Sequence, residues 1–163
     1  MIILSIGTNI GNRKANIENA ITALNAIGTV TAVSPIYSSE PWGFESENGF
    51  YNIALIIETS LSPLDLLQET QRIEKELGRT AKTTTAYADR IIDIDIIDYN
   101  NQIINTQTLT LPHSLMHKRN FVLYPLTDIA PDWQHPTLKL TALELKKESN
   151  DTSTIHILNT TTD

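Results

Sequence analysis

The 163-residue chain contains no cysteine, which excludes disulfide bonds, thiol nucleophiles and cysteine-ligated zinc sites. It is also poor in positive charge, because 12 Lys and Arg residues against 19 Asp and Glu residues give a formal net charge of −7. General nucleic-acid binding needs a basic face, so this balance argues against it. An acidic protein can still bind a polyphosphate where local arginines and metal ions reverse the field.

Long apolar runs are missing as well. The opening Met1–Ile6 stretch is far too short to span a bilayer, and no basic segment precedes it, so cytoplasmic residence without membrane contact is expected. The sequence contains no Walker A pattern, so a P-loop nucleotide site is not expected. The length predicts a single domain over residues 1–163, with a tail that frays after about residue 150. The sequence shows no exposed apolar stripe on a predicted helix, so a monomer is expected.

The most informative stretch is Arg90–Asp98, which reads Arg-Ile-Ile-Asp-Ile-Asp-Ile-Ile-Asp. In a β-strand, alternation places Asp93 and Asp95 on one face and the intervening isoleucines on the other. A helix would separate the aspartates, and β-branched isoleucine favours a strand. Two carboxylates about 7 Å apart along a strand are hard oxygen ligands of the kind that suit Mg²⁺, with water and substrate phosphates completing its shell.

The remaining periodic segments predict the fold. Strands are expected at 2–6, 29–37, 50–59 and 155–158, and helices at 17–27, 62–77, from 118 to before 131, and after 141. The order through residue 98 is β-α-β-β-α-β, which predicts an α+β, ferredoxin-like fold with an antiparallel sheet, helices on one face, an extra C-terminal hairpin and short helices. The acidic strand is expected to lie centrally in this sheet. The segment 7–12 is consistent both with a ligand wall and with a plain turn.

Several other polar side chains have ordinary explanations when taken singly. A lone histidine after proline, such as His113, is more often a loop hydrogen-bonder than a catalyst. Scattered arginines on an acidic protein are usually solvated, and an aromatic pair in a Pro/Gly loop is commonly a core plug. Together with the two aspartates, these residues match a site for nucleotide phosphates and Mg²⁺ built without a P-loop.

The segment 89–97 resembles the R-x-x-D-[LIV]-D-[LIV]-[LIV] signature of the 6-hydroxymethyl-7,8-dihydropterin pyrophosphokinase family of folate biosynthesis. Ordered matches at near-constant spacing are far more specific than an isolated Asp-x-Asp. They continue along nearly the whole chain: Gly7-x-Asn9, Glu40-Pro41-Trp42-Gly43, Tyr51-Asn52, Thr70-Gln71-Arg72-Ile73-Glu74, Gly78-Arg79, Leu111-Pro112-His113 and Arg119-x-Phe121.

The resemblance implies transfer of the β,γ-pyrophosphoryl group of ATP to the hydroxymethyl oxygen of the pterin, with release of AMP. It implies two Mg²⁺ ions held by Asp93 and Asp95, and catalytic roles for Arg79 and Arg90. The positions that match ATP-binding residues are Gln71, Glu74, Ile96, Thr110, His113 and Arg119. Those that match pterin-binding residues are Ser39, Glu40, Trp42, Phe50, Asn52, Tyr87 and Phe121.

The chain departs from the family pattern beside the acidic strand. Ala88-Asp89 stands where the family commonly has Gly-Pro, and Tyr87 replaces a tryptophan. Further from the strand, Thr108 replaces an arginine and Ser114 a tyrosine. An arginine of the segment before the strand appears as Ala81 or Lys82, and Lys82 is a candidate to supply its charge. None of these changes touches the aspartates, so the reaction is expected to be retained.

Two other classes of function stay open. One is a different Mg²⁺-dependent nucleotidyl transferase, because palm-like ferredoxin folds also carry strand aspartates. Such an enzyme would release free pyrophosphate. The acidic net charge of the chain counts against this alternative. The other is a non-catalytic binding module in which the Asp-x-Asp pair only stabilises a hairpin. That module predicts that Asp95→Ala changes stability and nothing else.

Overall fold

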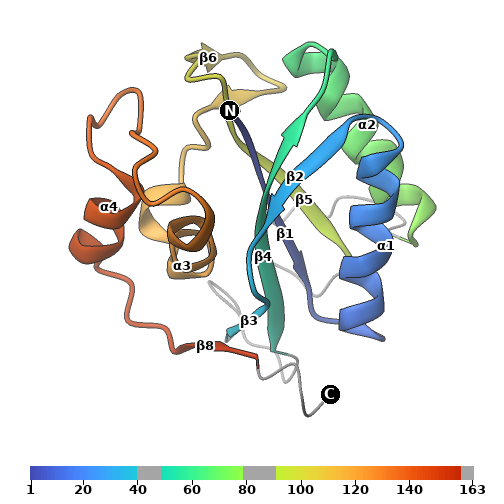
Figure 1. Ribbon diagram of the computed structural model, residues 1–163, viewed down its shortest axis with the longest axis horizontal. Helices are drawn as coiled ribbons and strands as arrows, with labels where there is room; N and C mark the ends of the chain where they lie inside the picture. The colour runs from blue at the N-terminus through green and yellow to red at the C-terminus, as the bar shows by residue number, and fades with distance from the viewer. Residues whose placement is uncertain (40–48, 79–90, 159–163) are drawn as a thin grey trace.

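The computed structural model describes residues 1–39, 49–78 and 91–158. Strands flank each of the first two helices along the chain, and shorter elements follow (Figure 1). Within these ranges, no helix combines the length and apolarity needed to cross a membrane. The elements are β1 (Ile2–Thr8), α1 (Arg13–Asn25), β2 (Thr29–Val33), β3 (Tyr37–Ser39), β4 (Phe50–Glu58), α2 (Pro63–Glu76), β5 (Asp93–Tyr99), β6 (Ile104–Asn105), β7 (Thr110–Leu111), the 3-10 helix η1 (Met116–Lys118), α3 (Asn120–Ile129), α4 (Ala142–Glu148) and β8 (Ile155–Ile157).

The main sheet is antiparallel in every pairing, with strand order β5-β1-β4-β3-β8 and with β2 also pairing with β4. This arrangement confirms the predicted antiparallel α+β fold. The predicted central position of the acidic strand is wrong. Among the described strands, β5 pairs only with β1, because β1 occupies the place between β4 and β5. Strand β5 therefore presents one edge to other groups.

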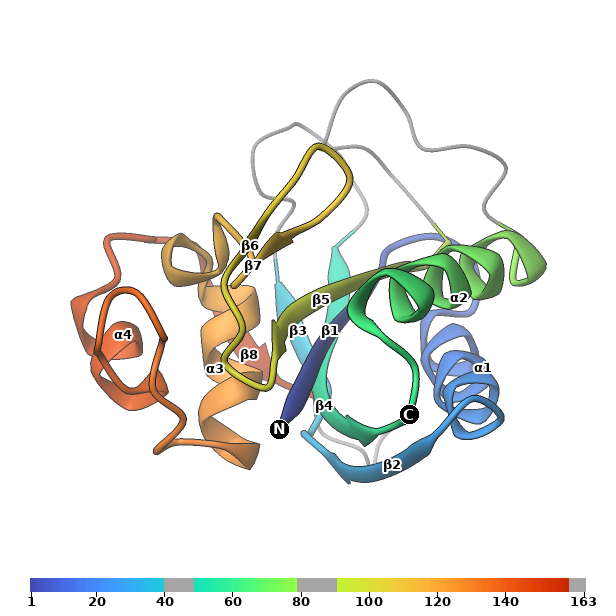
Figure 2. The ribbon, with the colours of Figure 1, turned by 90° about the horizontal axis from the view of Figure 1, so that it is seen from above.

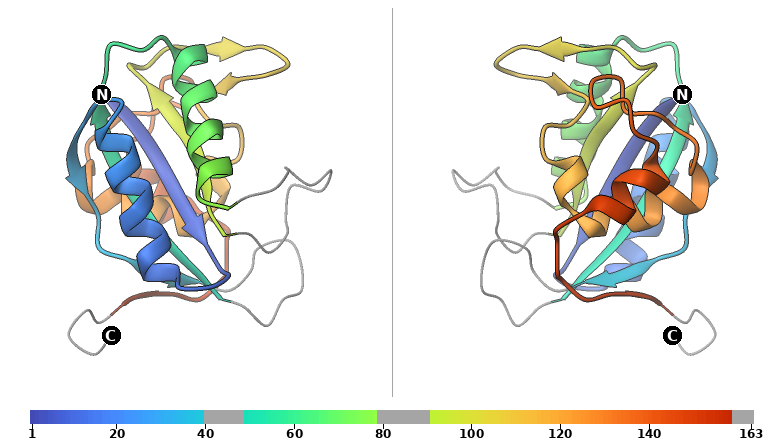
Figure 3. Two further views of the ribbon diagram at one scale, coloured as in Figure 1. Left: turned by 90° about the vertical axis from the view of Figure 1, so that its right-hand side faces the viewer. Right: turned by 90° about the vertical axis from the view of Figure 1, so that its left-hand side faces the viewer.

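Helices cover both faces of this sheet. Helices α1 and α2 lie on one face, as the ferredoxin-like order predicts, and the later helices α3 and α4 lie on the other (Figures 2 and 3). Each face carries its own apolar core. The α1/α2 core includes Leu4, Ile6, Leu24, Leu55 and Ile73. The α3/α4 core includes Ile3, Ala54, Leu123, Leu126 and Trp133.

Local sequence signals explain one helix start and one strand break. Ser62 caps α2, since its side chain accepts a hydrogen bond from the Asp65 backbone N–H at 3.2 Å. The strand predicted at 29–37 is instead divided into β2 and β3. Pro35 has no N–H to donate, and Ser34 exchanges hydrogen bonds with the backbone of Ala54. The division adds one residue opposite β4 and redirects the chain into β3.

A bulge in β5 sets the direction of its side chains. Ile3 pairs with Asp98 and Leu4 pairs with Ile96, so Ile97 is the extra residue. Ile96 faces the α1/α2 core, as predicted for the alternate isoleucines, and is only 5% exposed. Ile97 belongs to the α3/α4 core, and on the same side Asp98 accepts a hydrogen bond from Trp133 Nε1 at 3.2 Å. The bulge therefore anchors the end of the acidic strand to the second core.

We expect Asp98→Asn to raise the free energy of unfolding at pH 8 by about 1 kcal/mol. Desolvation of this fully buried carboxyl raises its pKa, despite opposing hydrogen bonds from Asn101 and Trp133. Because the pKa of Asp98 is higher in the folded state, protonation of this carboxyl stabilises the folded state. Wild type should therefore lose stability relative to the variant as pH rises from about 4 through the raised pKa. Urea denaturation at several pH values measures this difference, and exposed Asp132→Asn controls for loss of one negative charge. A difference that is constant with pH would contradict the prediction.

Candidate active site

The predicted site residues of β5 and β4 meet through a glycine of β1. Because β1 pairs with both neighbours, Asp93, Gly7 and Asn52 lie in one row across the sheet. Asp95 lies two residues further along β5, opposite Ser5, and alternation places it on the same face as Asp93. Both aspartates are partly exposed, whereas the isoleucines between and beside them are buried. The structure thus brings two carboxylates and one side-chain amide to the same end of one sheet face.

Gly7 provides the space between these groups. A Cβ atom at this position would lie 3.0 Å from Asn52 Oδ1 and 3.6 Å from Phe50 Cδ1. The first of these distances is tighter than almost all Cβ contacts, so a glycine here lets the amide and the ring approach the backbone closely. The sequence left open whether the segment 7–12 is a ligand wall or a plain turn, and it gave Gly7 no role of its own within the sheet. The only sequence feature that indicated this role was a small residue in an otherwise apolar strand.

The amide of Asn52 has a fixed orientation. The side chain is buried at 2% exposure, and its Nδ2 donates to Ser39 Oγ at 2.7 Å. Ser39 belongs to β3, where it lies opposite Phe50 in the ladder with β4. Three of the predicted pterin-binding residues are therefore neighbours. A buried amide held in this way is suited to recognising one edge of a flat polar ring.

His113 lies beside the carboxylates. Its backbone N–H donates to the Ile97 carbonyl at 2.9 Å, which fixes it at the outer edge of β5. Its Nδ1 accepts from the Leu115 N–H at 3.2 Å, and its Nε2 lies 4.0 Å from Asp95 Oδ2. A neutral imidazole that accepts at Nδ1 carries its proton on Nε2. The donor nitrogen of His113 is therefore the one nearest the carboxylate.

Arg119 and Phe121 lie at the start of α3. Arg119 is the N-cap residue of this helix and is only 7% exposed, and its guanidinium carbon lies 5.5 Å from the centroid of the Phe121 ring. Phe121 packs against the α3/α4 core, on the same side of the sheet as Ile97. A guanidinium next to an aromatic ring offers both a phosphate donor and a flat apolar surface.

Other predicted residues lie elsewhere or outside the described ranges. The Ile96 side chain points into the opposite core, so only its backbone can reach a ligand on the Asp93 face. Thr110 is exposed on β7, and Gln71 is half-buried on α2, which covers the opposite face. The residues outside the described ranges are Glu40, Trp42, Arg79, Lys82, Tyr87 and Arg90.

Glu74 has a structural contact that the resemblance did not suggest. This α2 side chain is 2% exposed, and its Oε2 accepts a hydrogen bond from the Ile94 backbone N–H at 2.9 Å. Ile94 lies between the two aspartates, and its N–H is on the strand edge away from β1. The carboxylate therefore substitutes for a neighbouring strand at the point where β5 carries Asp93 and Asp95.

We expect Glu74→Ala to lower the free energy of unfolding by about 1–3 kcal/mol, because the Ile94 N–H would be left buried without this acceptor. Glu74→Gln should retain most of the stability, since an amide oxygen can accept the same hydrogen bond. Urea denaturation of both variants tests the assignment. Equal stability of the alanine variant and wild type would show that the contact with Ile94 contributes nothing.

Comparisons with known proteins agree with this arrangement. The family model described as 7,8-dihydro-6-hydroxymethylpterin-pyrophosphokinase (HPPK) matches residues 3–131. The 2-amino-4-hydroxy-6-hydroxymethyldihydropteridine pyrophosphokinase of Aquifex aeolicus is 38% identical over 148 residues, which cover 91% of each chain. The corresponding enzyme of Porphyromonas gingivalis is 42% identical over 139 residues, which cover 83% of this chain and 94% of the relative.

Longer proteins also match. The Folic acid synthesis protein FOL1 of Dictyostelium discoideum is 40% identical over 156 residues, but this chain spans only 23% of its length. Among solved structures, wild-type HPPK-DHPS of Plasmodium falciparum superposes with a TM-score of 0.71 at 17% identity, covering 90% of this chain and 44% of that one. The structural match supports the fold, and the family match extends over most of the sequence. The chain belongs to the 7,8-dihydro-6-hydroxymethylpterin-pyrophosphokinase family.

Proposed function

We propose that the chain transfers the β,γ-pyrophosphoryl group of ATP to the hydroxymethyl group of 6-hydroxymethyl-7,8-dihydropterin, in folate biosynthesis. Family membership and relatives of similar length that are named as this pyrophosphokinase support the proposal. The observation that carries it is the row Asp93–Gly7–Asn52, in which a carboxylate and an oriented amide lie on either side of a glycine. We take the chain to act as a cytoplasmic, single-domain monomer.

The reaction makes one bond and breaks one. The hydroxymethyl oxygen bonds to the β-phosphorus, and the bond between that phosphorus and the oxygen bridging to the α-phosphorus breaks. The bridging oxygen leaves with the bonding electrons as part of AMP, and the hydroxyl proton is released. Such transfers depend on in-line placement and charge stabilisation more than on covalent help from the protein. Sheet-mounted polar groups on one face are suited to that task.

The donor set fits Mg²⁺. Within the ranges that the structure describes, no cluster of three or more His, Cys, Asp or Glu side chains is assembled. Mg²⁺ needs no such cage, because it binds one or two carboxylates and completes its shell with water and phosphates. Asp93 and Asp95 would hold two ions, as the resemblance implies. When bound, Mg²⁺ neutralises and aligns the phosphate oxygens.

The remaining residues divide into two groups according to the substrate that we assign to them. We assign His113 and Arg119 to the phosphates, since both offer donor nitrogens near β5 or at the start of α3. We assign Asn52 to the polar edge of the pterin and Phe50 and Phe121 to its ring faces. The hydrogen bond from Asn52 to Ser39 supports the first pterin assignment, because it fixes which amide atoms remain for the substrate.

A product assay by mass spectrometry tests the function. Wild type, Asp95→Ala and the exposed-site control Asp132→Ala are incubated with ATP, Mg²⁺ and 6-hydroxymethyl-7,8-dihydropterin. AMP and the pterin diphosphate should form with wild type and the control but not with Asp95→Ala. Nucleotide incorporation with free pyrophosphate would indicate a nucleotidyl transferase instead. Absence of Mg²⁺-dependent ATP binding in wild type would favour a non-catalytic binding module.

A further inference from the structure

The first turn of α1 contacts two chain segments that lead into the site. Asn16 contacts Ile91, two residues before Asp93, and Arg13 contacts Gly49, immediately before Phe50. Neither Arg13 nor Asn16 belongs to the residues assigned to ATP or pterin. A single helix turn is thus bonded to both halves of the proposed site.

Asn16 joins the end of β1 and the loop after it to the entry of β5. Its Nδ2 lies 3.1 Å from Thr8 Oγ1, 2.9 Å from the Ile10 carbonyl and 3.3 Å from the Ile91 carbonyl. The hydroxyl of Thr8, a fully buried residue, also donates to the Ile91 carbonyl. The regular ladder between β1 and β5 ends at the pair of Gly7 and Asp93. These side-chain bonds extend the attachment beyond the ladder and hold the entry to the acidic strand.

Arg13 holds the start of β4 from two sides. Its Nη1 donates to the Gly49 carbonyl at 2.9 Å, and its guanidinium carbon lies 4.1 Å from the centroid of the Tyr51 ring. These two contacts flank Phe50 in the sequence. Phe50 in turn lies next to Gly7 and opposite Ser39. The guanidinium therefore fixes the backbone from which the pterin-side residues project.

We propose that the first turn of α1, together with Thr8 at the end of β1, is a positioning element for both substrates, with Asn16 and Thr8 acting on the ATP side and Arg13 on the pterin side. This inference rests on the proposed function. None of these residues needs to touch the reacting atoms, because a displacement of about 1 Å in a supporting segment is enough to lower a rate by about 100-fold. The two sides are separated by Gly7, so their effects on the two substrates are separable.

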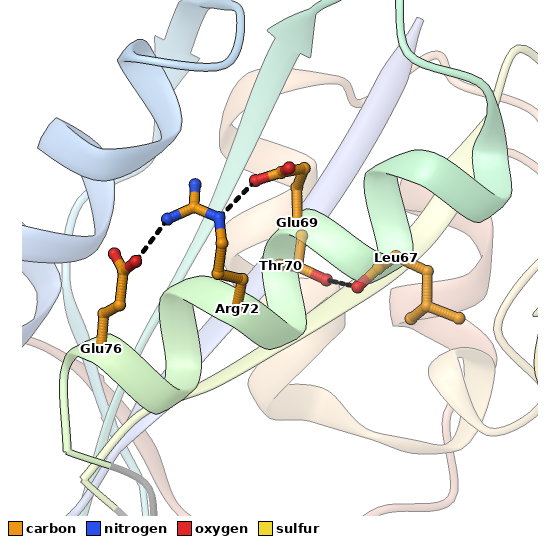
Figure 4. Close-up of polar contacts among 5 residues, drawn as sticks. All are labelled: Leu67, Glu69, Thr70, Arg72 and Glu76. Carbon is orange, nitrogen blue, oxygen red and sulfur yellow. Dashed lines mark hydrogen bonds and ion pairs between the residues drawn. The ribbon is translucent and has the colours of Figure 1, made fainter.

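The pterin side is tested with Arg13→Ala and Arg13→Lys. Both should raise the Kd of the pterin, measured by fluorescence, and its KM by about tenfold, with the KM of ATP unchanged. Lysine keeps the charge but lacks the planar guanidinium, so its loss should not exceed that of the alanine variant, and wild-type behaviour of Arg13→Ala would overturn a positioning role. Arg72→Ala is the matched control, because Arg72 is an exposed α2 residue paired with Glu69 and Glu76 at 2.6 and 2.7 Å (Figure 4).

The ATP side is tested with Asn16→Ala. We expect about a tenfold weaker binding of a non-hydrolysable ATP analogue in the presence of Mg²⁺, with pterin affinity unchanged. Amide hydrogen exchange over 92–94 should be faster than in wild type, because the entry to β5 is released. Thr8→Ser keeps the hydroxyl and should resemble wild type, whereas Thr8→Val should resemble Asn16→Ala. Asn19→Ala, an exposed change on the same helix, is the control.

The two failures can be told apart. If wild type forms no pterin diphosphate, the proposed function fails, and hydrogen exchange still reports whether Asn16 holds the strand. If wild type is active and the Arg13 and Asn16 variants retain both substrate affinities and normal exchange, the positioning proposal fails alone. Circular dichroism of each variant verifies folding, and a loss of affinity for both substrates in one folded variant would overturn the separation of the two sides.

Discussion

Asp95→Asn is expected to lower kcat by about 1000-fold or more while leaving the fold intact. The side chain is partly exposed on the face opposite the α1/α2 core, so an amide of the same size fits without repacking. The amide removes a negative charge and one anionic oxygen from the pair that would hold Mg²⁺. It also changes a carboxylate whose Oδ2 lies 4.0 Å from His113 Nε2. Steady-state kinetics under saturating substrates measure the loss.

Two comparisons make this result specific. Exposed Asp132→Asn removes the same charge away from β5 and should retain wild-type kcat. Thermal unfolding of Asp95→Asn should remain cooperative, with a midpoint close to that of wild type. A near-wild-type kcat in a folded Asp95→Asn variant would remove the metal-binding assignment, and with it the main argument for phosphoryl chemistry on this face.

Sequence periodicity predicted which side chains of β5 share a face, because alternation is a property of the strand itself. It could not predict the bulge at Ile97, since a bulge is defined only by pairing with Ile3 and Leu4 of a distant strand. The prediction of a central position for β5 in the sheet was wrong for the same reason. Which strand pairs with which depends on contacts far apart in the sequence, and the order of elements alone did not determine it.

The candidate site also combines features that the sequence predicted with features that only the fold defines. The resemblance named Ile96 and Glu74 as nucleotide-side positions, but it carried no information on direction. The structure shows that the Ile96 side chain is buried in the opposite core and that Glu74 supports the backbone of Ile94. Gly7 was noted only as part of the segment 7–12, a ligand wall or a plain turn, and Asn16 was not identified, because the importance of both depends on what the fold brings next to them. Residue type and spacing predicted the chemistry, and tertiary contacts define the supporting groups.

Asn52→Ala is expected to raise the KM of the pterin by about 100-fold, with a smaller effect on the KM of ATP. A site built to hydrogen-bond a polar edge discriminates strongly, because loss of the partner leaves buried polar groups of the substrate unpaired. Asn52 is suited to this role, since it is 2% exposed and its Nδ2 is bonded to Ser39 at 2.7 Å. Pterin and ATP titrations of the variant measure the two affinities.

The companion variants separate recognition from orientation. Ser39→Ala keeps the Asn52 amide but removes its hydrogen-bond partner, so we expect a loss of about tenfold, smaller than that of Asn52→Ala. Exposed Asn105→Ala should change neither affinity. Because Gly7 separates Asn52 from Asp93 in the row, the ATP affinity should be nearly preserved in both pterin-side variants. An equal loss of ATP and pterin affinity in Asn52→Ala would mean that the row does not divide the two substrates, and the assignment of residues to either side of Gly7 would have to be revised.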